Sequence, residues 1–274
     1  MVLPSLVGVS LAVVHPATLM AVDALSFVAS ALFIRAIRRM LQDPRRQLYQ
    51  VSAMAMRADI KEGLSFLLRH GGVRTMTIVG AAQCLAGGGF VALLVVWCDR
   101  VLGVGTSGWR FGLVYSAWSV GALLASITLP RILRYASPAT VALRVIPFSA
   151  VLGVVTTFAG RWELAAIGMF CWSIVYTLVV VNTISYRQQV SPEHLLGRVN
   201  TAGRMLSWGM RWTLGALAGG ALGSAVGVRP AMTTMAALGL VAVAVAWTSP
   251  LRGSGWDADV STRPDGAPGA ESTS

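Results

Sequence analysis

Long apolar stretches, each bounded by polar residues, recur along this chain and leave few folds open to it. Each has about the 20 residues that an α-helix needs to cross the roughly 30 Å hydrocarbon core of a bilayer. The stretches are 17–34, 75–97, 111–129, 141–159, 164–185, 205–228 and 230–249. Only 12% of the residues are charged, against about 25% in an ordinary soluble domain. The sequence therefore predicts an all-α membrane protein and excludes soluble, nucleic-acid-binding and disordered classes.

The basic residues predict how these stretches are oriented in a membrane. All but four of the 22 lysine and arginine residues fall in alternate loops on one side. The exceptions are Arg100, Arg110, Arg161 and Arg229. Cytoplasmic loops of membrane proteins carry an excess of Lys and Arg. We therefore expect a multi-pass protein of the inner (cell) membrane with a cytoplasmic C-terminus, and we expect no nucleic-acid partner despite the net charge of +11.

The polar connector before residue 75 contains an amphipathic segment at 59–70. Ile60, Leu64, Leu67 and Leu68 fall on one face at helical spacing. Asp59 and Glu62 have the spacing of a helix N-cap with its capping-box partner. We expect this helix to lie on the cytoplasmic membrane surface; a short helix packed on the loop is the alternative.

Side chains for metal, cofactor or covalent chemistry are scarce. The three cysteines lie in or beside apolar stretches, the three histidines are far apart, and no G-x-x-x-x-G-K-[ST] loop is present. We expect no metal, no cofactor, no disulfide framework and no enzymatic activity.

Several short motifs resemble those of one known family. They are Asp23-Ala24-Leu25-Ser26-Phe27, Glu62-Gly63-Leu64, Pro192-Glu193 and Leu196-Gly197-Arg198-Val199. Their order and separation resemble major facilitator superfamily efflux proteins, in the branch of enterobactin-type siderophore exporters and macrolide efflux pumps. That family has twelve helices in two halves of six, joined by a cytoplasmic loop.

The resemblance implies a division of the chain. Residues 1–37 would be part of helix five and all of helix six, and 38–74 the cytoplasmic central loop with its interfacial helix. Residues 75–252 would form the C-terminal six-helix bundle, and 253–274 a disordered cytoplasmic tail. Helices one to four would lie outside this sequence, so the chain would supply one wall of the family's substrate cavity.

The resemblance also implies a function, which is proton-coupled efflux of small amphipathic molecules, drug-like or siderophore-like. The expected partners are the lipid bilayer, a small-molecule substrate, protons, and a second copy or a separate N-terminal half. The alternative is a truncated, non-transporting membrane protein that assembles through a glycine-striped helix. A seven-helix receptor fits the number of spans, but the long basic connector argues against it.

Four polar residues inside the apolar stretches are candidates for a substrate or ion path: Asp23, Gln83, Asn182 and Arg211. An ionisable side chain near the bilayer centre is costly and often functional. Asp23 is the candidate proton carrier. Each also has a structural explanation, which is a local hydrogen bond for Asp23, a helix-to-helix hydrogen bond for Gln83 and Asn182, and snorkelling for Arg211.

Glycines form two groups within these stretches. One is Gly87, Gly88 and Gly89, and the other is Gly215, Gly219, Gly223 and Gly227 at four-residue spacing. Small residues at this spacing allow two helices to approach closely, so both groups are candidates for static packing or for a hinge.

Arginines near the cytoplasmic turns are candidates for a gate. Arg131 and Arg134 follow Pro130, where the family has the second copy of its gating loop, but no aspartate precedes them. Arg198 lies in the turn before the glycine-striped helix. An arginine here could hold helix-end carbonyls, or belong to an ordinary surface loop.

Overall fold

The computed structural model describes residues 16–36, 53–106 and 108–249, except a few side chains that include those of residues 210–212. Every element within these ranges is helical. The predicted partial span at 1–14, the first part of the connector and the tail predicted to be disordered lie outside the described residues.

The helices follow the apolar stretches closely. They are α2 (Pro16–Ala36), α3 (Ala53–Arg69), α4 (Gly71–Arg100), α5 (Trp109–Ile132), α6 (Pro138–Thr157), α7 (Trp162–Val190), α8 (Leu196–Gly209), the π-helical η1 (Met210–Gly215), α9 (Ala216–Val226), α10 (Val228–Ala237) and α11 (Gly239–Thr248). In the described residues, α4, α5, α6, α7 and the pair α10–α11 are long and apolar enough to span a membrane. The prediction of an all-helical protein is confirmed in the described residues, and five of the seven predicted spans have the length and composition of a multi-pass membrane protein.

The fifth helix of the bundle differs from its prediction. The apolar pattern predicts a span at 205–228, whereas the helical segment begins at Leu196 and is interrupted by η1. Residues 196–204 are too polar to belong to the apolar stretch, but they are helical and extend the helix at its N-terminal end.

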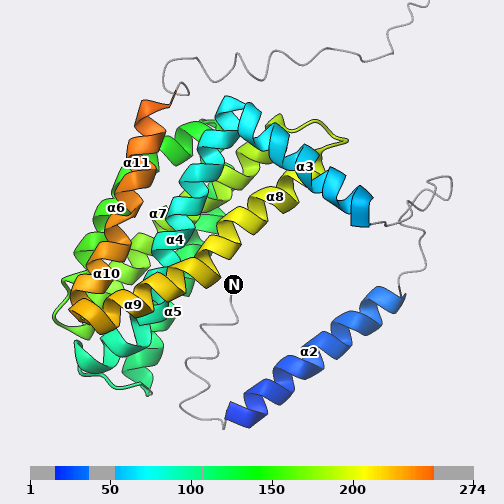
Figure 1. The fold of residues 1–274 in the computed structure, drawn as a ribbon. Coiled ribbons are helices and arrows are strands. Elements are labelled where there is room, and N and C mark those ends of the chain that lie inside the picture. The colour runs from blue at the N-terminus through cyan, green and yellow to red at the C-terminus, as the bar shows by residue number, and fades with distance from the viewer. Residues whose placement is uncertain (1–15, 37–52, 107, 250–274) are drawn as a thin grey trace, which may run out of the picture.

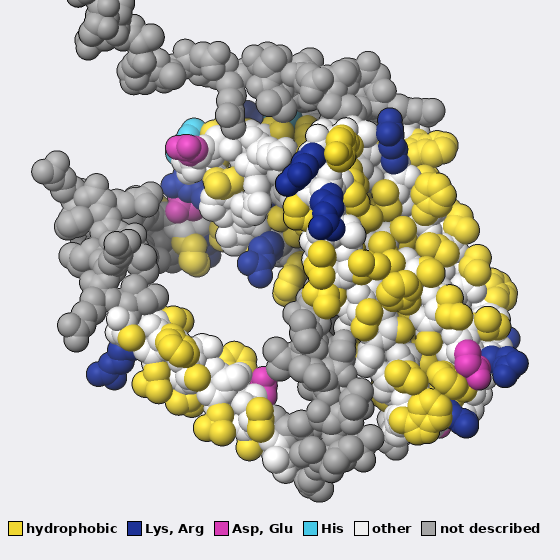
Figure 2. Space-filling model, turned by 180° about the vertical axis from the view of Figure 1, so that it is seen from behind, with side chains coloured by type: hydrophobic (Ala, Val, Ile, Leu, Met, Phe, Trp, Pro, Cys, Tyr) yellow, Lys and Arg dark blue, Asp and Glu magenta, His cyan; other side chains and the backbone are white. Residues whose placement is uncertain are grey.

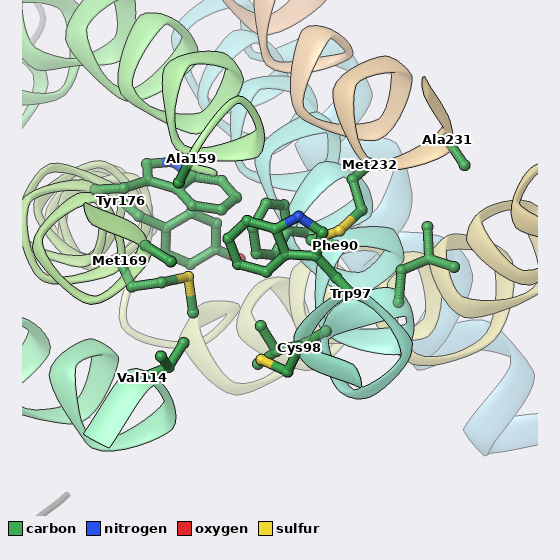
Figure 3. Packing of buried hydrophobic residues seen from close by; sticks show 13 residues of the cluster. Phe90, Trp97, Cys98, Val114, Ala159, Met169, Tyr176, Ala231 and Met232 are labelled. Carbon is green, nitrogen blue, oxygen red and sulfur yellow. The ribbon is translucent and has the colours of Figure 1, made fainter. Parts of the chain in front are cut away.

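The bundle is organised around α4 and α7 (Figure 1). Helix α7 packs against α5, α6 and α4, while α4 also contacts η1, α9, α10 and α11. Between them lies an aromatic cluster of Phe90, Trp97, Trp118, Trp172 and Tyr176, with ring centroids 4.6–6.1 Å apart. Figure 3 shows Phe90, Trp97 and Tyr176 directed into this interior.

The outer surface of the bundle is largely apolar. Figure 2 shows hydrophobic side chains over the middle of one face, with most of the charged ones toward its two ends. Exposed residues such as Leu124 and Ile127 of α5 and Val151 and Val155 of α6 belong to this kind of surface. Apolar patches of this extent are rare on soluble monomers, and they suit contact with lipid.

Helix α2 lies apart from the bundle (Figure 1). It contains one acidic and one basic residue, Asp23 and Arg35, among 21 residues. Each of its described side chains is exposed. At 1.5 Å per residue its 21 residues extend about 31 Å.

The predicted capping box is wrong. Helix α3 begins at Ala53, so Asp59 and Glu62 lie well inside it. The preceding residues Ala-Met-Ala-Met-Arg-Ala are all good helix formers and give the helix no reason to start at residue 59. The predicted apolar face is also divided, since Leu67 is buried while Ile60 and Leu68 are exposed. The position of α3 at a membrane surface stays a prediction.

Candidate functional site

Two groups of glycines that are far apart in the sequence meet inside the bundle. This glycine crossing consists of Gly88 and Gly89 on α4 with Gly215 and Gly219 at the end of η1 and in α9. A Cβ added at Gly215 would lie 2.8 Å from the carbonyl oxygen of Leu85, and one at Gly219 would lie 2.7 Å from that of Gly89. The two helices are therefore in backbone contact, which residues larger than glycine would prevent.

The helix that crosses α4 departs from α-helical geometry at this contact. Residues Met210–Gly215 form η1, and α9 continues directly from Ala216. Short π segments inside helices are uncommon and often occur at functional sites. Arg211, a predicted path residue, lies in η1, and its side chain is outside the described residues.

The other predicted glycines have different environments. Gly87 is adjacent to the ring of Tyr176, so a Cβ there would lie 2.7 Å from the phenolic oxygen. Gly223 faces the end of the Leu93 side chain. Gly227, predicted to continue the stripe, instead lies between α9 and α10 with φ +87°. This left-handed conformation favours glycine, so Gly227 makes the turn between the two helices.

A polar network links three helices beside the aromatic cluster. Gln83 of α4 is buried, and its Nε2 donates a hydrogen bond to Ser149 Oγ of α6. Trp172 Nε1 of α7 donates to the same oxygen at 3.3 Å. Gln83 is thus placed for helix-to-helix bonding within the packed interior.

Asn182, the other uncharged path candidate, is fully buried in α7. Its Nδ2 donates to the carbonyl oxygen of Leu178 at 2.7 Å, one turn earlier. Its Oδ1 is buried and has no hydrogen-bond partner among the described residues. The amide therefore has one unused acceptor inside the bundle.

A second contact between distant segments lies where α3 packs on α8. This charged junction consists of Asp59, Glu62 and Gly63 of α3 with Arg198 of α8. Arg198 Nη2 lies 2.9 Å from Asp59 Oδ1, and Nη1 forms an ion pair and hydrogen bond with Glu62 Oε2. A Cβ on Gly63 would lie 2.8 Å from the carbonyl carbon and oxygen of Arg198. The junction thus joins two of the motifs that carry the family resemblance.

The remaining predicted residues lie away from both contacts. Asp23 is exposed on α2, where its carbonyl oxygen accepts a hydrogen bond from Ser26 Oγ at 2.7 Å. Helix α5 continues through Pro130 to Ile132, and Arg131 and Arg134 are exposed at its end. Within the described ranges neither arginine has a carboxylate partner. Of the three gate candidates, only Arg198 is thus placed to join two helices in this part of the chain.

A buried arginine that was not among the predicted site residues contacts α8, the helix that carries Arg198. Arg187 is 2% exposed at the end of α7, and its Nε donates to Asn200 Oδ1 of α8 at 3.3 Å. Its guanidinium contacts Gly203, where α8 has no side chain. From the sequence, Arg187 is one of several arginines just beyond an apolar stretch, and no local pattern separates it from the rest.

Across the described residues, no group of three or more His, Cys, Asp or Glu side chains could hold a metal ion. No protein-family model matches the chain, and no curated protein matches it. The geometry offers a side-chain-free helix crossing inside the membrane domain and an ionic contact at the end where α4 begins.

Proposed function

We propose that this chain is part of a secondary transporter that moves small amphipathic molecules out of the cell in exchange for protons. The described bundle would form one wall of the substrate path. A separate N-terminal half or a second copy of the chain would supply the opposite wall. The proposal draws on the resemblance to major facilitator efflux proteins and on one structural observation.

That observation is the glycine crossing, at which η1 ends and α9 begins. Backbone surfaces without side chains can shift past each other without rotamer changes, whereas interlocked side chains resist sliding. A π segment places a departure from regular helix at the same contact. Discontinuous membrane helices of this kind occur at the binding sites of transporters. The glycine crossing therefore favours a contact at which the two helices can slide along each other over one at which they are fixed.

The energy source and the substrate follow from chemistry. Buried carboxylates can carry protons across membranes, and Asp23 is the candidate on the apolar helix α2. A substrate that enters the path from the cytoplasmic leaflet must itself tolerate an apolar environment, which favours amphipathic molecules. Siderophore-like and drug-like compounds both meet this requirement.

Assembly through the glycine stripe is a weaker proposal. Gly215 and Gly219 are buried against α4 within the bundle, so they present no surface to another chain. A non-transporting partner function would need a different face, such as the exposed sides of α2.

Transport can be tested in cells that express the full chain with a C-terminal tag and are loaded with ethidium, an amphipathic cation. Expression should lower the dye retained by energised cells, and a protonophore should remove the difference. The tag would establish that equal amounts of protein reach the membrane.

Two variants distinguish an effect on helix movement, measured as the efflux rate, from an effect on folding, measured as the membrane level. Gly223→Ala places a methyl group against the movable end of Leu93, so we expect normal membrane levels with slower efflux. Gly220→Ala is the matched control on the same helix, because no atom lies within 4 Å of its added Cβ. Absence of dye efflux by the unmodified chain, at a verified membrane level, would show that it does not transport this probe and would contradict the proposal.

A further inference from the structure

A cavity of about 660 Å³ lies on α3 beside the turn that leads into α8. Its lining comes from α3, from His70 and from Leu195. Helix α3 lies at the end of the bundle where α4 begins (Figure 1), and Glu62 belongs both to the cavity lining and to the charged junction. The proposed transport cycle does not use it.

Four of the eight residues around this cavity carry side-chain hydrogen-bond donors. Lys61, Ser65 and Arg69 follow one another at four-residue spacing on α3, so they share one face of the helix. His70 adds a fourth donor. Its Nδ1 accepts a hydrogen bond from the backbone N–H of Val73 at 3.3 Å, which leaves Nε2 as the nitrogen that carries the proton.

The positive charge on this face is not neutralised by α3 itself. Glu62 also lines the cavity, but its carboxylate is paired with Arg198, as is that of Asp59. In the described part of the chain, neither Lys61 nor Arg69 has a carboxylate within 4.0 Å. The two acids of α3 share the single cation of Arg198, so the charged junction keeps a net charge of −1, while Lys61 and Arg69 stay available to another anion.

The rest of the lining is apolar. Phe66 stacks on the His70 ring with centroids 5.6 Å apart, and Leu195 and Ala58 complete the wall. Leu68, on the same helix, is half exposed. The face therefore combines phosphate-binding donors with adjacent hydrocarbon, a combination that a free phosphate ion would not require.

We propose that this cavity binds the headgroup phosphate of an anionic phospholipid of the cytoplasmic leaflet. Lys61 and Arg69 neutralise the phosphate, Ser65 and His70 donate hydrogen bonds, and the acyl chains lie along the apolar surface near Leu68. His70 precedes the predicted start of the membrane stretch at residue 75 by five residues, which is about 8 Å of helix rise. The inference rests on the membrane orientation that the proposed function assumes.

The test measures lipid retained by the full chain in detergent, by native mass spectrometry, with phosphatidylglycerol and phosphatidylcholine added separately. The Lys61→Gln/Arg69→Gln double variant should lose affinity for phosphatidylglycerol by about thirtyfold, as expected for two basic side chains near a lipid surface. Its affinity for phosphatidylcholine should not change. The matched control is Arg131→Gln/Arg134→Gln, which removes the same charge from exposed cytoplasmic arginines and should cost less than about threefold.

Inorganic phosphate shows whether the site binds a lipid headgroup or a free phosphate ion. At the concentrations at which phosphatidylglycerol saturates the site, inorganic phosphate should not displace the lipid. Equal losses in the two double variants would mean that only net charge matters and would overturn the inference. Saturable binding of inorganic phosphate without lipid selectivity would overturn it too. Dye efflux by the unmodified chain is measured independently, so a failure of lipid selectivity and a failure of transport are separate results.

Discussion

The glycine crossing and the charged junction solve the same packing problem in different surroundings. In each, a glycine lets one helix reach the backbone of another, with added-Cβ distances of 2.7–2.8 Å. The junction adds a guanidinium held between two carboxylates, whereas the crossing is made of backbone from residues without side chains.

The two contacts differ in how far water and salt can weaken them. At the junction the ionic groups are about one third to one half exposed, so water and salt weaken the attraction. Inside the membrane domain, close van der Waals packing replaces the missing hydrophobic driving force between helices. We therefore expect shape to matter more at the crossing than at the junction, and salt to matter at the junction alone.

The largest effect is expected at the crossing. Gly219→Leu would force a side chain into the backbone of α4, and a backbone carbonyl cannot rotate away from it. The free energy of unfolding should fall by about 3 kcal/mol, at the upper end for overpacked cores. Dodecyl sulfate titration in mixed micelles, followed by circular dichroism, would measure it.

Gly220→Leu is the control for this change, because the position is exposed and open. It should leave the unfolding midpoint within about 0.5 kcal/mol of the unmodified value, as for surface substitutions. Similar losses in the two variants would mean that backbone contact does not determine stability there.

The polar network beside the aromatic cluster gives the next effect. Ser149→Ala removes the oxygen that accepts hydrogen bonds from both Gln83 and Trp172. Since hydrogen bonds between membrane helices contribute about 0.6 and at most about 1.7 kcal/mol, we expect a loss of about 1.5 kcal/mol in the same titration. Ser224→Ala, which removes an exposed bond within one helix, should have almost no effect.

A smaller loss is expected at the junction for the same kind of clash. Gly63→Ala places a methyl group against the carbonyl of Arg198, but α3 lies at the end of the bundle and can move outward. The expected destabilisation is about 1 kcal/mol. It should be local, so hydrogen exchange should become faster in α3 and stay unchanged in α4. Gly197→Ala, with open space around it, should leave both rates as they are. A global loss as large as that of Gly219→Leu would remove the contrast between the regions.

The ion pair itself should give the smallest effect and the clearest salt dependence. A double-mutant cycle with Arg198→Gln and Glu62→Gln should yield a coupling of about 0.5 kcal/mol, which decreases as salt is added. The pair Arg161–Glu163, at 3.6 Å with a largely exposed arginine, should show almost none. A coupling that did not change with salt would indicate that the junction is shielded from water.

The helices were predictable because apolar length is a local property of the sequence. The stretches at 75–97, 111–129 and 164–185 each lie within a helix of the bundle. The ends of the helices were harder to predict from the sequence. The polar residues from Leu196 to Arg204 carry no apolar signal, and nothing before Asp59 stops α3 from beginning at Ala53.

The contacts of the candidate site depended on pairings that the sequence does not encode locally. The glycines were recognisable from the sequence as positions of close approach. The sequence did not show that Gly215 and Gly219 meet α4 at Gly88 and Gly89. Arg198 could be selected as a gate candidate from its turn, whereas its carboxylate partners lie up to 139 residues earlier in the chain. Such a pairing becomes visible only when the helices are placed in space.

The aromatic cluster gives the bundle interior an optical property. The ring centroids of Trp118 and Trp172 are 5.2 Å apart, and those of Tyr176 and Trp172 are 6.1 Å apart. Excitation energy absorbed by one ring can therefore transfer to another before fluorescence is emitted. Fluorescence from this group will respond collectively when α4, α5 and α7 separate. A lipid with a quencher in its acyl chain would reach indoles on the outside, such as Trp247, and leave the buried group bright.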